Sequence, residues 1–186
     1  IWEDDSPLSW VVNVVLAFVI IKFLVYPGLG LVLGTSHPLV AVVSESMEHD
    51  VIFDKWWEQN KAAYKQFGIA ENDFSSYTLK NGFNKGDIIV LMGAAPEKIK
   101  KGDIIVYQSR RPDPIIHRVV GIKSENGNFI YTTKGDNNAN IIKEADLDET
   151  NIRPDTVIGK AKLRVPLLGY VKIISVALFN TIKGGS

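Results

Sequence analysis

The stretch from Asp87 to Ile122 reads DIIVLMGAAPEKIKKGDIIVYQSRRPDPIIHRVVGI, and it indicates the fold class most clearly. It contains three runs of mostly β-branched residues bounded by Gly, Pro, Asn or Asp, which is the pattern of short β-strands. The expected strands are Asp87–Leu91, Asp103–Tyr107 and Pro114–Ile122. The motif KGDIIV occurs twice, and a turn followed by an apolar strand explains it more simply than a solenoid repeat.

Similar runs flank this stretch on both sides. The further strand candidates are Leu39–Val43, Phe129–Thr133 and Val157–Leu163, and the segment Glu125–Asn128 (ENGN) is typical of a hairpin turn. Residues 35–166 are therefore expected to form a mainly β domain.

The N-terminal region is strongly apolar. Leu8–Tyr26 reads LSWVVNVVLAFVIIKFLVY, and as a helix it would reach about 28 Å, close to the ~30 Å hydrocarbon core of a bilayer. Pro27 and the glycines after it would end that helix. A buried core helix rarely stays apolar on every face, and the run is long for a cleaved signal peptide. We expect a retained transmembrane anchor at about residues 8–26, within an N-terminal segment 1–34.

A helical period interrupts the β pattern inside an expected insertion at residues 50–83. Between Val51 and Phe67 the apolar positions recur at helical spacing, namely Phe53, Trp56, Trp57, Ala63, Tyr64 and Phe67. Two surfaces fit this Trp-rich face, the β domain itself and a membrane interface, because the period does not name the surface. The C-terminal segment 167–186 is apolar but short for a span, so an interfacial or packed helix is expected there, with a truncated second anchor as the alternative.

The composition excludes several classes of function. Lys plus Arg equals Asp plus Glu at 21 each, so the basic surplus of a nucleic-acid binder is missing. Cys is absent, which excludes a disulfide framework, a Cys-based zinc site and a thiol nucleophile. His37, His49 and His117 have no H-x-x-x-H spacing, so no metal site and no cofactor are expected. His37 and His49 lie in polar sequence and are expected at the surface.

Three polar groups stand next to apolar strands. Ser44 and Ser46 are two residues apart, so in extended chain they point to one side, where one can attack a carbonyl and the other can help bind the oxyanion. The alternation of side chains along the expected strand places His117 on an apolar face, and an imidazole suits the role of general base. Asp136, in TKGDNN, follows another strand and has the chemistry to orient that ring. Each of these groups taken alone also fits a turn or a core residue.

Taken together, the blocks SESM, KGDIIVL, IIHRVVGI, TKGDNN and VIGKAKLRVPLLGYV resemble type I signal peptidases of peptidase family S26. More narrowly they resemble the archaeal and endoplasmic-reticulum branch, in which His replaces the general-base Lys of bacterial enzymes. The resemblance runs from the anchor to about Lys172. It implies a signal-peptidase-like β-fold and a membrane-bound serine endopeptidase that removes signal peptides from exported preproteins. The catalytic domain would lie on the extracytoplasmic or lumenal face of the cell membrane, with the bilayer and other membrane subunits as partners.

The same resemblance implies roles for single residues. Ser46 is the nucleophile, Ser44 the oxyanion-hole hydroxyl and His117 the base. Family members often carry a second Asp six residues after the GDNN one, but Ile142 stands there in this chain. The triad acid is therefore expected to be Asp136, with Asp146 as the second choice.

Substrate is expected beside the strand Leu39–Val43, against Val40, Val42 and Val43. Two alternatives stay open. One is a Ser–Lys peptidase of the same family with Lys85, Lys101 or Lys134 as base, and the other is a membrane-anchored β domain that binds partners without catalysis.

Overall fold

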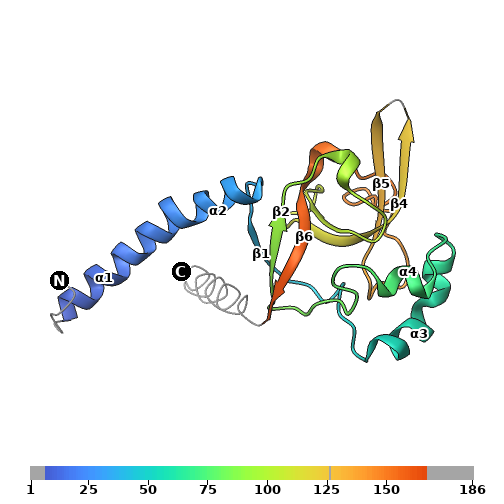
Figure 1. Ribbon diagram of the computed structural model, residues 1–186, viewed down its shortest axis with the longest axis horizontal. Coiled ribbons are helices and arrows are strands. Elements are labelled where there is room, and N and C mark those ends of the chain that lie inside the picture. The colour runs from blue at the N-terminus through green and yellow to red at the C-terminus, as the bar shows by residue number, and fades with distance from the viewer. Residues whose placement is uncertain (1–6, 126, 167–186) are drawn as a thin grey trace.

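The computed structural model describes residues 7–125 and 127–166. Within them, six strands form one curled antiparallel sheet with the order β1-β2-β6-β3-β4-β5 (Figure 1). The strands are β1 (Leu39–Ala41), β2 (Ile88–Met92), β3 (Ile104–Tyr107), β4 (Ile115–Glu125), β5 (Asn128–Lys134) and β6 (Val157–Val165). The mainly β class is confirmed, and each expected strand is present with bounds shifted by at most three residues.

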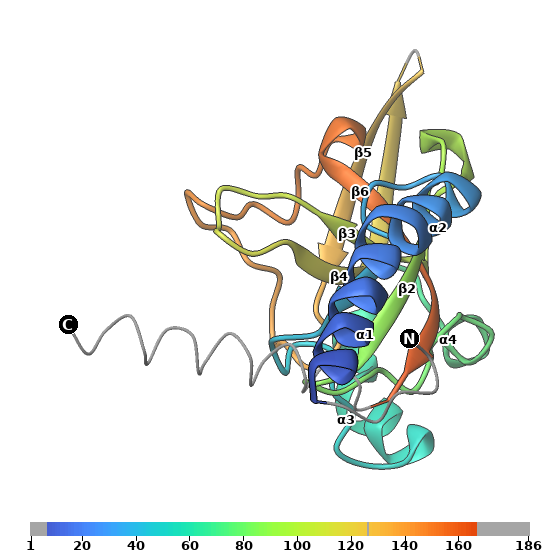
Figure 2. The same cartoon turned by 90° about the vertical axis from the view of Figure 1, so that its left-hand side faces the viewer.

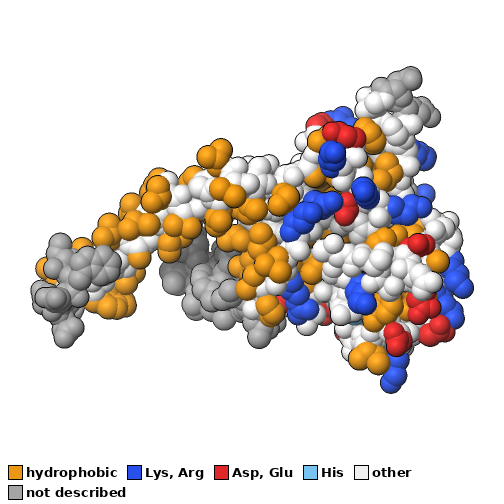
Figure 3. Space-filling view, in the orientation of Figure 1, with side chains coloured by type: hydrophobic (Ala, Val, Ile, Leu, Met, Phe, Trp, Pro, Cys, Tyr) orange, Lys and Arg blue, Asp and Glu red, His pale blue; other side chains and the backbone are white. Residues whose placement is uncertain are grey.

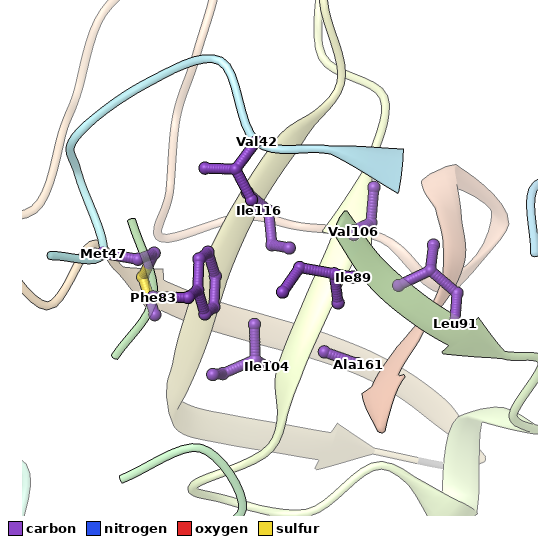
Figure 4. Close-up of a cluster of buried hydrophobic side chains, with 9 residues drawn as sticks. All are labelled: Val42, Met47, Phe83, Ile89, Leu91, Ile104, Val106, Ile116 and Ala161. Atoms are coloured by element: carbon purple, nitrogen blue, oxygen red, sulfur yellow. The ribbon is translucent and has the colours of Figure 1, made fainter. Parts of the chain in front are cut away.

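The two faces of the sheet carry separate hydrophobic cores. β3 is buried along its whole length, and its alternating side chains enter both cores. Ile104 and Val106 join the first core (Figure 4), whose other members are Val42, Met47, Phe83, Ile89, Leu91, Ile116 and Ala161. Ile105 and Tyr107 join the second, together with Ile99, Val119, Tyr131, Leu147 and Ile152. The period of two in the sequence is therefore what places residues on either side of the sheet.

A long apolar helix extends away from the β domain (Figure 1). It consists of α1 (Pro7–Ile20), a π-helical turn (Ile21–Val25) and α2 (Tyr26–Leu33). Its 27 residues are long and apolar enough to cross a membrane, and hydrophobic side chains cover the side of it seen in Figure 3. The N-terminal apolar helix expected from the sequence is thus present.

The helix ends later than expected. It continues through Pro27 to Leu33. Proline has no backbone N–H to donate, and the preceding π-helical turn accommodates this, because the Tyr26 N–H bonds the Ile21 carbonyl five residues back. It stops at Gly34, which adopts a left-handed φ of 63°. The expectation that Pro27 ends the helix is therefore wrong.

The end of this helix is joined to the sheet by backbone contacts. The Gly93 N–H donates to the Leu33 carbonyl at 2.8 Å, and the Thr35 hydroxyl donates to the Ile158 carbonyl at 2.8 Å. A side chain at Gly93 would lie 1.9 Å from the Gly34 carbonyl oxygen, so this close approach requires glycine. The β domain is thereby held at the end of the apolar helix.

The helical insertion packs on the sheet. Its helices are α3 (Phe53–Lys65) and α4 (Glu71–Ser75), which lie at the end of the domain away from the β4–β5 hairpin (Figure 2). Trp56, Trp57 and Tyr64 are buried in a third cluster with Phe74 and with Val120 of β4. Packing against the β domain is therefore confirmed, and the membrane-interface interpretation of the Trp-rich face is wrong. The segment expected at 167–186 lies outside the described residues.

Candidate active site

Ser46 lies in the loop that follows β1. The next residue, Met47, is buried in the first core, and the Ser46 carbonyl accepts a 2.8 Å hydrogen bond from the Asn137 N–H. The Ser46 Oγ is 3.0 Å from His117 Nε2 and 3.1 Å from Ser44 Oγ. Three of the residues singled out in the sequence therefore meet at one point, although the serine and the histidine are 71 positions apart.

His117 lies on β4 with its ring buried. Its Nδ1 is 2.5 Å from Glu149 Oε1. Because an ionised carboxylate only accepts hydrogen bonds, Nδ1 carries the proton and Nε2 is free to accept from the Ser46 hydroxyl. Gly135 lies against the ring, where a Cβ would be 2.9 Å from Nε2. Ring tautomer and ring position are thus both defined by direct contacts.

The carboxylate that contacts His117 is Glu149, which sequence reasoning did not select. Glu149 is fully buried. Its Oε1 also accepts from the Thr133 hydroxyl at 3.0 Å, and its Oε2 accepts from the Ile142 N–H at 2.8 Å. Ile142 is the position at which the resembling family often carries Asp. Its backbone amide holds a glutamate that arrives from seven residues later.

Asp136, the first candidate for the triad acid, lies next to the loop that carries Ser46, where its N–H contacts the Met47 sulfur. Its carboxylate accepts from Arg118 Nη2 at 2.6 Å, from the Tyr64 hydroxyl at 2.8 Å and from His49 Nε2 at 3.1 Å. The structure does not bring it to His117 Nδ1, which faces Glu149 instead.

The electrostatics of this group follow from burial and pairing. Burial favours the protonated form of Asp136, but the charge of Arg118 and hydrogen bonds from His49 and Arg118 outweigh it and hold the pKa well below its ordinary value. Burial likewise disfavours the Arg118 cation, yet Asp136 outweighs that effect and raises its pKa. For Tyr64, burial and then the Asp136 charge raise the pKa, so the phenol is a neutral donor. The pair is therefore ionised throughout the physiological range.

His49 was expected at the surface, and that expectation is wrong. Its side chain is 1% exposed. The ring stacks on Trp56 of α3 with centroids 3.7 Å apart. The partner lies in the insertion, so the polar local sequence gave no sign of it. His37 is exposed, as expected.

Asp146, the second candidate, is half exposed. Its Oδ2 accepts from Arg111 Nε at 2.9 Å, and the Arg111 Nη2 also donates to Glu144 at 2.7 Å. This contact lies at the rim of the site rather than on the histidine.

A cavity of about 400 Å³ opens onto Ser46 and His117. Val40 and Val43 line it, whereas Val42 points the other way, into the first core (Figure 4). Alternation separates Val42 from Val43, whereas Val40 both packs against the first core and lines the cavity. The walls are mainly apolar, as a pocket for small aliphatic side chains requires.

The ammonium groups of two of the three lysines considered as bases donate to other partners. Lys134 is buried, its Nζ donates to the Gly135 carbonyl at 2.9 Å, and burial lowers its pKa. The Nζ of Lys101 donates to the Phe67 carbonyl at 2.8 Å. The backbone N–H of Lys85 donates to Glu48 at 2.8 Å. The basic group next to Ser46 is His117.

Comparison with known proteins shows which proteins this chain is similar to. No family model matches the chain. Over 157 residues it is 27% identical to the signal peptidase complex catalytic subunit of Homo sapiens, covering 81% of this chain and 64% of that subunit. The corresponding subunit of Komagataella phaffii is 29% identical over 160 residues, covering 82% of this chain and 74% of the relative. That of Yarrowia lipolytica is 26% identical over 156 residues, covering 82% and 72%.

The chain thus spans less than two thirds of the length of the human relative. The similarity to these relatives agrees with the family resemblance of the sequence blocks around Ser46, His117 and Asp136. The chain is therefore similar to these eukaryotic catalytic subunits over about four fifths of its length.

Proposed function

We propose that this chain is a membrane-anchored serine endopeptidase that cleaves signal peptides from exported preproteins. The observation that carries the proposal is the continuous contact from Ser46 Oγ to His117 Nε2 at 3.0 Å and from His117 Nδ1 to Glu149 at 2.5 Å. A hydroxyl, an imidazole and a carboxylate in this order form the constellation that performs acyl transfer on unrelated folds.

In the proposed mechanism, Ser46 Oγ attacks the scissile carbonyl while His117 Nε2 takes its proton. The imidazolium then gives that proton to the leaving amine, and water hydrolyses the acyl-enzyme by the same route. Glu149 holds the Nδ1 tautomer and stabilises the imidazolium, so it takes the role first expected of Asp136 or Asp146. The Ser46 N–H and the Ser44 hydroxyl, 3.1 Å from Ser46 Oγ, would bind the oxyanion.

The substrate would pair as an extended strand with the free edge of β1. β1 is the first strand in the sheet order and pairs on one side with β2, which leaves its other edge open within the described residues. Backbone pairing of this kind gives affinity, and the adjacent cavity takes alternate side chains. Its apolar lining at Val40, Val43 and Ile115 would accept small aliphatic residues before the cut.

The apolar helix would hold the site at the outer or lumenal surface of the cell membrane. Gly93 and Thr35 attach the β domain to the end of that helix. A signal peptide is itself an apolar helix in the same bilayer, so tethering both partners raises their effective concentration without new contacts. Other membrane subunits are proposed as partners, because the relatives are named as catalytic subunits of complexes.

The test is cleavage of a detergent-solubilised preprotein by the purified chain and by Ser46→Ala and His117→Ala variants. Both variants are expected to lose activity, since each removes one member of a unit that acts together. Cleavage by Ser46→Ala would end the assignment. Loss in Ser46→Ala with full activity in His117→Ala would favour a lysine base, and inactivity of the unaltered chain would favour a non-catalytic binding domain.

A further inference from the structure

The outer wall of the cavity beside Ser46 forms where two loops meet. One loop follows β3 and carries Arg110 and Arg111. The other is a short hairpin at residues 142–149, closed at its base by the Glu149 N–H donating to the Ile142 carbonyl at 3.0 Å. Its tip closes where the Glu144 N–H donates to the Leu147 carbonyl at 2.9 Å. The base of this hairpin therefore carries the carboxylate that contacts His117.

Several polar contacts join the tip of the hairpin to the first loop. Arg111 donates to Asp146 at 2.9 Å and to Glu144 at 2.7 Å. The Arg110 N–H donates to the Asp146 carbonyl at 3.1 Å, and its guanidinium donates to the Ala145 carbonyl at 3.2 Å. Of these, the Arg111 fork is the charged contact that reaches two carboxylates.

The tip has little packing to hold it. Asp146 lines the cavity beside Ser46 and also a second cavity of about 430 Å³. A loop with open space on both sides gains few van der Waals contacts, so hydrogen bonds and ion pairs decide its position. Leu147 is buried and anchors the middle of the hairpin, but the two acidic side chains point outward to Arg111.

We propose that Arg111 is a positioning residue: it holds the 142–149 hairpin so that the cavity wall is complete and Glu149 stays on the His117 ring. This inference rests on the proposed peptidase function. Arg111 does not touch the reacting atoms. It acts through Asp146 and Glu144 at one end of the hairpin, and the Ile142–Glu149 pairing carries the effect to the other end.

Arg111 is 30% exposed and its two partners are more exposed still, so each ion pair is weak and is screened by salt. Two partners on one planar fork add geometric definition that a single surface pair lacks. The expected loss for Arg111→Gln is therefore moderate, about 3- to 10-fold in kcat/KM.

The experiment measures kcat/KM against pH and against salt for the unaltered chain, Arg111→Gln and Arg111→Lys. The control is Arg153→Gln, which breaks an exposed ion pair with Asp155 away from the cavity beside Ser46. In Arg111→Gln the acid limb of the pH profile is expected to move to lower pH, because a displaced Glu149 stabilises the imidazolium less. Raising salt from about 0.1 to 1 M should slow the unaltered chain and Arg153→Gln more than Arg111→Gln.

Arg111→Lys should recover part of the activity, since it restores the charge without the fork. Activity and pH profile of Arg111→Gln equal to those of the unaltered chain would overturn the proposal. So would a loss of kcat/KM with an unmoved acid limb and an unchanged salt response, because that pattern describes a residue that only stabilises the fold. Lack of cleavage by the unaltered chain would instead remove the proposed function itself, which separates the two failures.

Discussion

Asp136 and Glu149 are both fully buried carboxylates close to Ser46, but their hydrogen-bond partners differ. Asp136 is bonded to the guanidinium of Arg118, a cation that does not titrate in proteins. Glu149 is bonded to neutral donors, the Thr133 hydroxyl and the Ile142 N–H, and to the imidazole of His117. The charge of a carboxylate paired with a permanent cation is already balanced. A carboxylate that faces an imidazole can instead stabilise the positive charge that the ring carries each time it is protonated.

The Asp136 site instead ties three parts of the fold together. Tyr64 reaches it from the insertion and His49 from the loop that carries Ser46. The next residue, Asn137, bonds the Ser46 carbonyl through its N–H and the Glu45 carbonyl through its side chain. Asp136 is thus placed to support the loop that carries Ser46, whereas His117 Nδ1 contacts Glu149.

The largest effect is expected from Glu149→Gln. The amide keeps the shape of the side chain but cannot stabilise an imidazolium, and its NH₂ group favours the wrong ring tautomer. We expect kcat to fall on the order of 10⁴-fold in the preprotein assay, with an unchanged circular dichroism spectrum. The matched control is Asp146→Asn, which should lose no more than about 10-fold. Near-normal activity of Glu149→Gln, together with a folded but inactive Asp136→Asn, would mean that Asp136 rather than Glu149 acts in catalysis.

The second effect is expected from Asp136→Asn, and it concerns stability. The change leaves the buried Arg118 cation without its counter-charge, which costs about 3–5 kcal/mol. Thermal unfolding in detergent should show a large drop in Tm, and activity should follow the folded fraction. A normal Tm together with lost activity would place Asp136 in the chemistry.

Both carboxylates show where sequence reasoning reaches its limit. The strands were predictable, because β-branched runs with a period of two reflect the sheet directly. Ser46 and His117 were predictable because each sits at or in such a strand and the surrounding blocks resemble a known family. Glu149 was not, because its role depends on a hairpin that pairs it with Ile142. A pairing of this kind produces no periodic pattern in the sequence.

The same reason explains the other differences. His49 is buried by Trp56, whose position depends on how the insertion folds back over the sheet. The apolar helix passes Pro27 because a π-helical turn supplies a different bonding pattern just before it. Local composition therefore predicted the elements, and contacts between elements decided which polar residues became the site.

The third effect is a pH dependence of stability. The pKa of Asp136 is depressed in the folded chain, mainly because the Arg118 charge overcomes the effect of burial. Its contribution is therefore complete above the unfolded value of about 3.9 and is lost as pH falls through the lower folded value. The difference in Tm between the unaltered chain and Asp136→Asn should stay constant from pH 7 to about 5, and it should narrow only in stronger acid. A difference that narrows near neutral pH would contradict the ionised pair.

The smallest effects compare two tyrosines, one on each carboxylate site. Tyr64 donates to Asp136 at 2.8 Å, and Tyr107 OH lies 2.9 Å from the Thr133 hydroxyl, which itself donates to Glu149. The single Thr133 proton is used on Glu149, so Tyr107 must be the donor to Thr133. Removing either phenol hydroxyl should cost about 1–2 kcal/mol of stability.

The two variants should differ in kinetics. Tyr64→Phe should leave kcat of the folded enzyme unchanged, because Asp136 keeps its bonds to Arg118 and His49. Tyr107→Phe should lower kcat several-fold, because the Thr133 hydroxyl loses the donor that orients it toward Glu149. Unfolding curves and single-turnover cleavage rates of both variants measure this directly. Equal rates would mean that Glu149 is held well enough by Ile142 alone, and a slower Tyr64→Phe would bring the Asp136 site into the catalytic step.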